Sequence, residues 1–258
     1  MKAARFDLDA YEKRIRAFDG ARFEVAEAAT IRDRDEAHPI LMVRSRVDAE
    51  RTLLVLAGVH GDERAGILAV PFLLEAWSSS LRGAHENVRL VVMTPVNPFG
   101  AAANRRTNAQ RRDINRDFLR FVTPEARAVR AVFDEVNPNF VVSLHEGPQR
   151  GTFMFTNRYV GAPLAIALCD ALAAGGTVLA TRDYFGRSLR PAGCAPATAV
   201  TRAVWKFGAS ALGVQATITY SEGRSVPEIV LESSSRTTDE AARIRPHVDL
   251  VLAVAKRL

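Results

Sequence analysis

The sequence predicts an α/β fold, a single-domain α/β/α sandwich with a mixed, mostly parallel central sheet. Residues 53–59, 88–96 and 139–145 are continuous apolar runs, which is the pattern of strands buried on both faces of a parallel sheet. Segments with apolar residues at helical spacing alternate with these runs, as they do when helices connect parallel strands. The composition, with 48% hydrophobic and 25% charged residues, is that of an ordinary folded globular protein.

The first elements follow from the spacing of their apolar residues. Residues 21–28 and 39–47 alternate apolar and polar side chains, so we expect a hairpin at the edge of the sheet. The buried strand 53–59 precedes a helix expected over about 64–77, in which apolar side chains recur at helical spacing. Residues 88–96 then form a second buried strand.

The second half of the chain continues this alternation. The expected elements are, in order, a loop over 97–117, a helix over 124–136, strands over 139–145 and 152–156, a helix over 161–176, strands over 214–220 and 227–232, and a terminal helix over 238–256. Proline opens the first of these helices and a glycine pair closes the second. The stretch 180–213 is rich in Gly, Pro and Ala and has no regular pattern.

The expected organisation is one domain over residues 1–258, because the sequence holds no internal repeat, low-complexity tract or long linker. A chain of this size buries roughly 70–75% of the surface of its unfolded form, so its core needs no disulfide. No apolar run reaches the roughly 18 residues of a membrane span, and the first residues lack the apolar core of a secretory signal. We therefore expect a cytoplasmic protein without membrane contact. The sequence does not indicate an oligomeric state.

The net charge of +6 raises the question of nucleic-acid binding. Only four of the 35 basic residues are lysines, and the arginines are spread along the whole chain. A nucleic-acid surface is expected to cluster its basic residues and interleave them with aromatic ones, which are only 7% here. The pattern favours a solvated surface and no nucleic-acid partner. The segment 104–120 is the exception, since it concentrates six arginines.

Polar side chains gather where the predicted parallel strands end. In such sheets ligands bind beyond the carboxyl ends of the strands. The residues at these positions are His60 with Glu63, Asn97, His145 with Glu146, and Glu232.

His60 and Glu63 lie three residues apart on a turn that leads into a helix. Their side chains can aim at one point, as in catalytic zinc sites, which have three protein ligands and an open fourth position. His145 is the candidate for the third ligand. An isolated pair of this kind is better explained by a helix cap and a first-turn carboxylate stabilised by the helix dipole. The expected convergence with His145 and Glu232 favours the metal site.

Five motifs appear in an order that characterises a known family. They are Val59-His60-Gly61-Asp62-Glu63, Asn97-Pro98-Phe99-Gly100, Arg106-Thr107-Asn108 with Asp113-Ile114-Asn115-Arg116-Asp117-Phe118, Ser143-Leu144-His145-Glu146, and Ile229-Val230-Leu231-Glu232. Over residues 53–232 the chain resembles the zinc carboxypeptidases of the carboxypeptidase A superfamily, which includes aspartoacylase and succinylglutamate desuccinylase. Phe99 and Glu146 depart from the pattern of the classical carboxypeptidases.

The resemblance implies one zinc ion per chain, held by His60, Glu63 and His145. Glu232 would be the general base that activates the zinc water and then protonates the leaving amine. Arg106 would polarise the scissile carbonyl and stabilise the oxyanion.

The resemblance also implies the substrate contacts. Asn115 and Arg116 would hold the free carboxylate of the substrate, a role that suits the guanidinium fork of arginine. Tyr220, at the end of an expected strand, is the candidate for the substrate-capping tyrosine of the family, with a core tyrosine as the alternative. Glu146 would line the pocket, orient a ligand or serve only as a strand-end carboxylate.

We therefore expect a zinc metallohydrolase of the carboxypeptidase type. It would cleave the amide bond of a small peptide or acyl-amino acid next to a free carboxylate. The first alternative is an N-acyl-amino-acid deacylase of the succinylglutamate desuccinylase and aspartoacylase type. Aspartoacylases carry a further C-terminal domain, whereas about 26 residues follow Glu232 here. The second alternative is a non-catalytic binding protein on a degenerate hydrolase fold.

Overall fold

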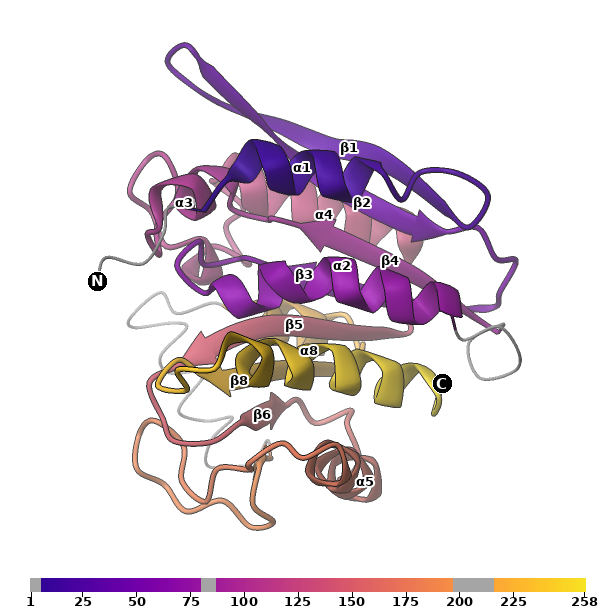
Figure 1. Ribbon diagram of the computed structural model, residues 1–258, viewed down its shortest axis with the longest axis vertical. Helices are drawn as coiled ribbons and strands as arrows, with labels where there is room; N and C mark the ends of the chain where they lie inside the picture. The colour runs from indigo at the N-terminus through magenta and orange to yellow at the C-terminus, as the bar shows by residue number, and fades with distance from the viewer. Residues whose placement is uncertain (1–5, 80–86, 197–215) are drawn as a thin grey trace.

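A mixed eight-stranded sheet forms the centre of the molecule, in the order β1-β2-β4-β3-β5-β8-β6-β7 (Figure 1). The computed structural model describes residues 6–79, 87–196 and 216–258. The strands are β1 (Phe23–Asp33), β2 (Glu36–Ser45), β3 (Arg51–Ala57), β4 (Val88–Thr94), β5 (Phe140–Gly147), β6 (Phe153–Thr156), β7 (Cys194–Ala195) and β8 (Glu228–Ser234). The helices are α1 (Leu8–Arg16), α2 (Arg64–Ser79), α3 (Pro98–Ala103), the 3₁₀ turn η1 (Ile114–Arg116), α4 (Pro124–Val136), α5 (Ala162–Ala174), α7 (Thr217–Gly223) and α8 (Glu240–Ala255).

The four central strands are parallel. β3 pairs in parallel with both β4 and β5, and β5 pairs in parallel with β8. The antiparallel pairs lie on either side of this group, with the β1–β2 hairpin joined to β4 and with β6 joined to β8. This arrangement confirms the predicted α/β fold with a mixed, mostly parallel sheet. It also brings the carboxyl ends of β3, β5 and β8 to one edge.

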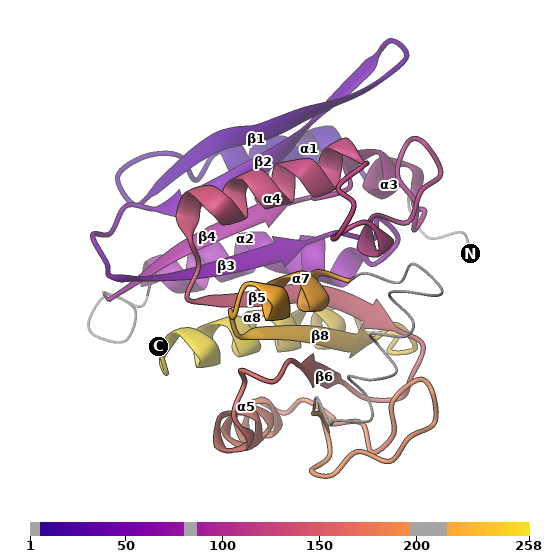
Figure 2. The same cartoon turned by 180° about the vertical axis from the view of Figure 1, so that it is seen from behind.

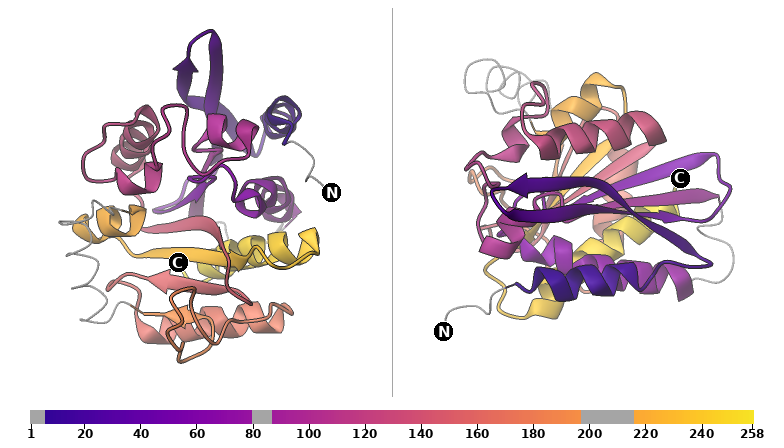
Figure 3. Two further views of the ribbon diagram at one scale, coloured as in Figure 1. Left: turned by 90° about the vertical axis from the view of Figure 1, so that its left-hand side faces the viewer. Right: turned by 90° about the horizontal axis from the view of Figure 1, so that it is seen from above.

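Helices cover both faces of the sheet, as Figures 2 and 3 show. α1, α2, α5 and α8 pack on one face around a large apolar cluster that includes Val55, Val142 and Leu231. α4 and α7 lie on the other face, and α4 packs there around Leu54, Val91 and Val141. Neighbouring residues of one strand belong to opposite clusters, as the pleat requires. A sheet buried in this way explains the continuous apolar runs of the sequence.

The predicted bounds of α4 match the structure at both ends. Thr123 caps the helix by accepting a hydrogen bond from the backbone N–H of Ala126, and Pro124 occupies the first turn, where a missing N–H costs nothing. Asn137 closes the helix in the left-handed conformation. These local signals fix the helix independently of its packing.

The predicted strand over 214–220 is wrong, because Thr217–Gly223 forms helix α7. Thr217, Ile218 and Ser221 are buried, which is the spacing of one helical face. Seven residues of mixed polarity fit both periods, and tertiary contacts decide between them. Residues 214 and 215 of this predicted strand lie outside the described residues, as does most of the unassigned stretch, residues 197–213.

The segment 97–117 is more ordered than the expected loop. Asn97 accepts a hydrogen bond from the N–H of Gly100 and so begins α3, and Asp113 accepts one from the N–H of Asn115 at the start of η1. Such short turns have no periodicity to detect.

None of the described helices is long and apolar enough to cross a membrane. The described strands all join one sheet. The expectation of one domain over residues 1–258 stays a prediction.

Candidate active site

The predicted ligands meet at the carboxyl edge of the sheet. His60 follows β3 after the turn at Gly58, whose φ of +75° favours glycine. A side chain at Gly61 would meet the backbone of Gly100 at 2.0 Å, so only glycine lets this turn pack against α3. Glu63 directly precedes α2, and His145 lies near the end of β5.

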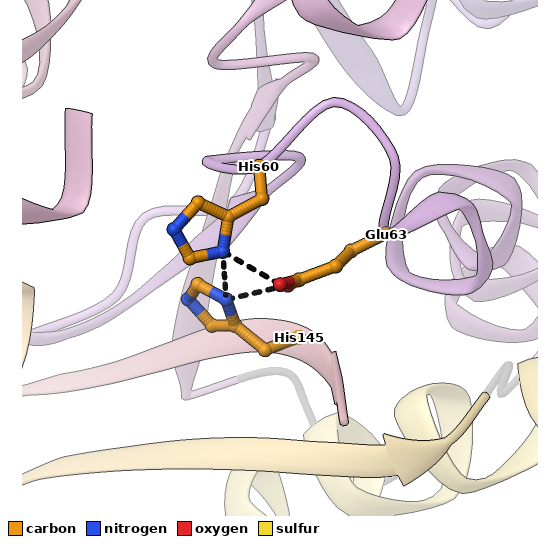
Figure 4. Close-up of side chains that lie close together, drawn as sticks. All are labelled: His60, Glu63 and His145. Atoms are coloured by element: carbon orange, nitrogen blue, oxygen red, sulfur yellow. Dashed lines mark hydrogen bonds and ion pairs between the residues drawn. The ribbon is translucent and has the colours of Figure 1, made fainter. Parts of the chain in front are cut away.

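Figure 4 shows how closely the three side chains converge. Nδ1 of His60 lies 2.7 Å from one carboxylate oxygen of Glu63, and Nδ1 of His145 lies 2.7 Å from the other. The two Nδ1 atoms are 3.2 Å apart. Both histidines are 2% exposed, so water contributes little to this arrangement.

This donor set fits a metal ion. Two imidazole nitrogens and a carboxylate are ligands that zinc prefers, and three protein ligands leave a fourth position open. Two buried ring nitrogens that face each other across a carboxylate require a proton or a cation between them. Within the parts of the chain that the structure describes, His60, Glu63 and His145 are the group with metal-ligand geometry.

Asp113 fixes the orientation of His60. Its Oδ1 lies 3.2 Å from Nε2 of His60, on the far side of the ring from Glu63. A proton on Nε2 that is donated to Asp113 leaves the lone pair of Nδ1 for a metal, which is how metal-ligating histidines are commonly held. Burial alone would lower the pKa of His60, but the carboxylates of Glu63 and Asp113 raise it to about 9. Asp113 stands at the start of the motif Asp113-Ile114-Asn115-Arg116, but the sequence alone predicts no role for it.

The pKa values of the two buried carboxyl groups of the site, Glu63 and Glu232, are shifted in opposite directions. Burial would raise the pKa of Glu63, but the two histidines hold it well below its usual range. Glu232, which is paired with His145 across the β5–β8 ladder, is 7% exposed. Its pKa is raised well above the usual value by burial and by the negative charge of Glu63. The surroundings thus hold Glu63 as the anion beside the histidines, whereas those of Glu232 favour its protonated form.

Arg106 and Arg116 reach the site through Asp113. Nε of Arg106 donates to Asp113 over 3.0 Å, and its Nη1 donates to Glu63 over 3.2 Å. Nε of Arg116 lies 3.3 Å from the same oxygen of Asp113, Oδ2. The Arg106 side chain is 47% exposed and that of Arg116 59%, so each guanidinium contacts both the site and the solvent.

Asn115 lies between these arginines and α7. Its Oδ1 accepts a hydrogen bond of 3.4 Å from the backbone N–H of Thr217. This bond assigns the carbonyl end of the side chain, and the amide Nδ2 is then the end that can donate to an anion.

The Glu146 side chain makes its contacts with the helices α2 and α8. Its Oε2 accepts from the backbone N–H of Ala65 over 2.8 Å, at the start of α2. Its Oε1 accepts from Nε and Nη2 of Arg243 on α8, over 2.8 and 2.7 Å. The side chain is 2% exposed. Of the three readings that the sequence left open, these contacts favour a strand-end carboxylate, here one that binds two helices to β5.

Tyr220 lies on α7 and not at the end of a strand. Its ring packs against Phe121 and Phe133, with ring centres 5.1 and 5.0 Å away. These contacts belong to the apolar cluster under α4. The structure thus favours the core reading of this tyrosine over the capping one.

Sequence reasoning missed Tyr184, the tyrosine that does approach the site. Its ring packs edge-on to Phe153, at 5.6 Å, and Phe153 is the β6 partner of Glu232. Burial and the charges of Glu232 and Glu63 raise the pKa of Tyr184 far above its usual value. It stands in the stretch 180–213, where the one available signal was the turn sequence Asp183-Tyr184-Phe185-Gly186.

The remaining histidines lie outside the ligand group or outside the described residues. His38 packs edge-on to Phe99, and His247 is buried on α8, where Nε2 lies 2.9 Å from Oγ of Ser233. His85 is outside the described residues.

Known proteins resemble this chain in sequence and in fold. Residues 49–122 match the family model of the succinylglutamate desuccinylase/aspartoacylase catalytic domain. Murein peptide amidase A of Escherichia coli strain K12 is 32% identical over 80 residues, which are 31% of this chain and 31% of that protein. The aligned segment thus spans about a third of this curated relative.

Solved structures match over almost the whole chain. A candidate metallopeptidase of Shewanella denitrificans superposes with a TM-score of 0.74 and 16% identity, covering 97% of this chain and 88% of the other. A metallo-carboxypeptidase of Pseudomonas aeruginosa, solved with (2-guanidinoethylmercapto)succinic acid, gives a TM-score of 0.67 and 19% identity over 96% of this chain and 67% of the other. At this identity the likeness concerns the fold. Together with the family match over residues 49–122 and the order of the motifs, it supports the zinc carboxypeptidase-like superfamily for this chain.

Proposed function

We propose that the chain is a zinc-dependent hydrolase of the carboxypeptidase type, which cleaves an amide bond next to a free carboxylate. The observation that carries the proposal is the convergence of two Nδ1 atoms and one carboxylate, with Glu232 on the adjoining strand. His60, Glu63 and His145 would hold one zinc ion per chain. When bound, zinc acts as a Lewis acid and lowers the pKa of a coordinated water toward about 7.

Glu232 would move the protons of the reaction. Its pKa is raised by burial and by Glu63, and a raised pKa makes the carboxylate a stronger base. As the base it would take a proton from the attacking water, and as the acid it would deliver that proton to the leaving amine. General acid–base catalysis of this kind typically contributes a factor of about 10²–10⁴.

Arg106 would stabilise the negative charge that develops on the carbonyl oxygen. Its guanidinium is held by Glu63 and Asp113, so it is already oriented before a substrate binds. A preorganised cation costs no reorganisation at the moment of reaction.

Asn115 and Arg116 would anchor the free carboxylate of the substrate. Arg116 uses Nε for Asp113, which leaves its Nη groups for a second anion. The backbone N–H of Thr217 fixes the oxygen of Asn115, so that Nδ2 of Asn115 can donate to the same carboxylate as the Nη groups of Arg116. A substrate held here would present its amide to Arg106 and Glu232.

A deacylase is the second candidate, and the family match over residues 49–122 favours it. An N-acyl-amino acid offers the same amide and the same free carboxylate as the C-terminal end of a peptide. The two reactions would use the same residues and differ in the group on the acyl side of the bond.

Hydrolysis of paired substrates tests both candidates. The zinc-loaded chain is incubated with dipeptides and N-acyl-amino acids, each supplied with a free carboxylate and as the carboxamide. We expect cleavage of the free acids and a loss of about 100-fold or more for the amides and for the Glu232→Gln variant, which should keep its zinc. Equal cleavage of acids and amides would contradict the carboxylate anchor. No cleavage of any compound would favour the non-catalytic binding protein.

A further inference from the structure

A tight turn between α5 and β7 is built around a buried aspartate. The Asp183 carboxylate accepts hydrogen bonds from the backbone N–H groups of Phe185 and Arg187, both over 2.9 Å, and from Nε of Arg187 over 2.8 Å. Gly186 completes the turn with a φ of +82°, and Asp183 itself is 4% exposed. These bonds fix the backbone of the turn that carries Tyr184 and Phe185 at its tip.

Tyr184 lies against the strands that carry the site. Its ring is 5.6 Å from that of Phe153 and 5.7 Å from that of Phe155, both on β6. A side chain at Gly147, two residues after His145, would come within 3.1 Å of the Tyr184 ring. Phe153 and Glu232 face each other across the β6–β8 ladder, and such cross-strand partners have side chains on the same face. The ring of Tyr184 is therefore next to the proposed catalytic base.

Phe185 continues this apolar surface toward the solvent. Its ring lies 4.6 Å from that of Tyr184, and the residue is 70% exposed. Phe185 is thus a solvent-exposed ring on a turn with a fixed backbone. Such a residue is suited to contact a ligand, because a rigid ring buries a large area at little entropic cost.

The order of the strands places this turn opposite the arginines. Arg106 and Arg116 gather at Asp113, which contacts His60 after β3, whereas Tyr184 of the turn packs on β6. In the sheet, β3 and β6 lie on opposite sides of β5 and β8. Both segments stand at the end of the sheet to which β5 and β8 point (Figure 1). A substrate whose carboxylate is bound by the arginines would extend its acyl side across Glu232 toward Tyr184 and Phe185.

We propose that Tyr184 and Phe185 form the apolar wall of the substrate pocket and select substrates with an apolar or aromatic acyl group. The inference rests on the proposed function for the placement of the carboxylate. It adds the substrate class, which is an amino acid with an aromatic N-acyl group or a peptide with an apolar residue before the scissile bond.

The test compares two ligands that differ only in the acyl group, N-benzoylglycine and N-acetylglycine. Their dissociation constants are measured by titration calorimetry with the zinc-loaded full chain carrying Glu232→Gln, which prevents turnover. We expect the benzoyl compound to bind about tenfold more tightly. Adding Phe185→Ala should reduce this preference by about three- to tenfold, the range expected from one aromatic contact.

Two further variants separate the ring from other effects. Tyr184→Phe keeps the ring and should keep the preference for the benzoyl group. Phe72→Ala removes a 43% exposed phenylalanine from α2 and should also leave the preference unchanged. An unchanged preference in Phe185→Ala, or no benzoyl preference in the parent protein, would overturn the proposal.

The same data distinguish this inference from the proposed function. If the chain prefers the benzoyl compound through Phe185 but hydrolyses none of the paired substrates, the result would support the proposed apolar wall. It would contradict the proposed hydrolase function. Carboxylate-dependent hydrolysis without a benzoyl preference would contradict the wall alone.

Discussion

Asp113 connects four residues of the candidate site without being a proposed metal ligand. It contacts Nε2 of His60 and the Nε atoms of Arg106 and Arg116, and it accepts the N–H of Asn115. One carboxylate thereby orients a proposed metal ligand, the proposed oxyanion residue and the proposed carboxylate anchor. Its pKa is kept well below the usual range, since His60 and Arg106 outweigh the effect of its burial. The side chain is thus ionised when it makes these contacts.

Replacing Asp113 by Asn should weaken zinc binding about 10- to 100-fold, the usual effect of losing a partner of a metal-bound histidine. The affinity is measured by competition with a chromogenic chelator. Asp35→Asn, at an exposed position in the turn between β1 and β2, serves as the control and should bind zinc as the unaltered chain does. An affinity of Asp113→Asn equal to that of the control would contradict the orienting role.

Replacing Arg116 by Met should raise KM for free-acid substrates about tenfold or more, because a charge-assisted hydrogen bond to the substrate is lost. The kcat should change little if the contact is equally strong in the transition state. Steady-state kinetics with Arg120→Met as the control, an exposed arginine of the same segment, measures both constants. A fall in kcat with an unchanged KM would move Arg116 from binding to chemistry.

The sequence indicated these residues only in part. His60, Glu63 and His145 could be found because they follow buried strands, whose ends must meet at one edge. The structural place of Glu146 could not be predicted, because it depends on Arg243, which is 97 residues away on α8. Tyr184 was missed because its neighbours have no periodic pattern, and its position depends on the side chain of Asp183.

At the scale of the elements, a buried carboxyl group joins α7 to the sheet. Oε1 of Glu228, at the start of β8, accepts hydrogen bonds from Oγ of Ser143 over 2.9 Å and from Oγ1 of Thr217 over 2.6 Å. Thr217 opens α7, and its N–H contacts Asn115. Burial raises the pKa of Glu228 to about 7 against these bonds, which lower it.

This raised pKa predicts the sign of a pH dependence. The folded chain binds the proton of Glu228 more tightly than the unfolded chain, so the free energy of unfolding falls as the pH rises from about 4.5 to about 7. The contribution of this group is up to about 3 kcal/mol. Glu228→Gln removes it, so the stability of the variant relative to the unaltered chain should increase over this range. Urea unfolding at several pH values measures the difference, and a constant difference would contradict the raised pKa.

The elements themselves were predictable where local signals agreed with packing. α4 begins and ends as expected because a cap, a proline and an αL asparagine mark it. The strand expected over 214–220 was wrong because this segment has no cap or proline that marks a helix. The contact of Thr217 with Glu228, which helps to place α7, forms only in the folded chain. α3 and η1 were missed because each is shorter than two helical turns.

At the scale of the molecule, the parallel sheet brings distant parts of the chain to one site. His60 and His145 are 85 residues apart, and only the β3–β5 pairing makes them neighbours. The buried charges and ring nitrogens gathered there oppose folding unless a cation or protons balance them. The bound metal should therefore stabilise the whole fold.

Zinc removal should lower the melting temperature. A ligand present at 100 times its dissociation constant adds about 2.7 kcal/mol to the free energy of unfolding, which corresponds to about 5–10 °C for a chain of this size. Calorimetric scans before and after dialysis against a chelator measure the shift, and re-addition of zinc should restore it. The His60→Ala variant should show no zinc-dependent shift. The same shift in that variant would mean that zinc stabilises the chain from another site.

The central claim is that His60, Glu63 and His145 form a zinc site, and elemental analysis of the purified chain tests it most directly. The measurement is made after incubation with zinc at neutral pH, beside His60→Ala and beside His38→Ala, a histidine that packs on Phe99 away from the site. We predict about one zinc per chain in the unaltered protein and in His38→Ala, and none in His60→Ala. A chain without zinc, or equal zinc in His60→Ala, would contradict the account.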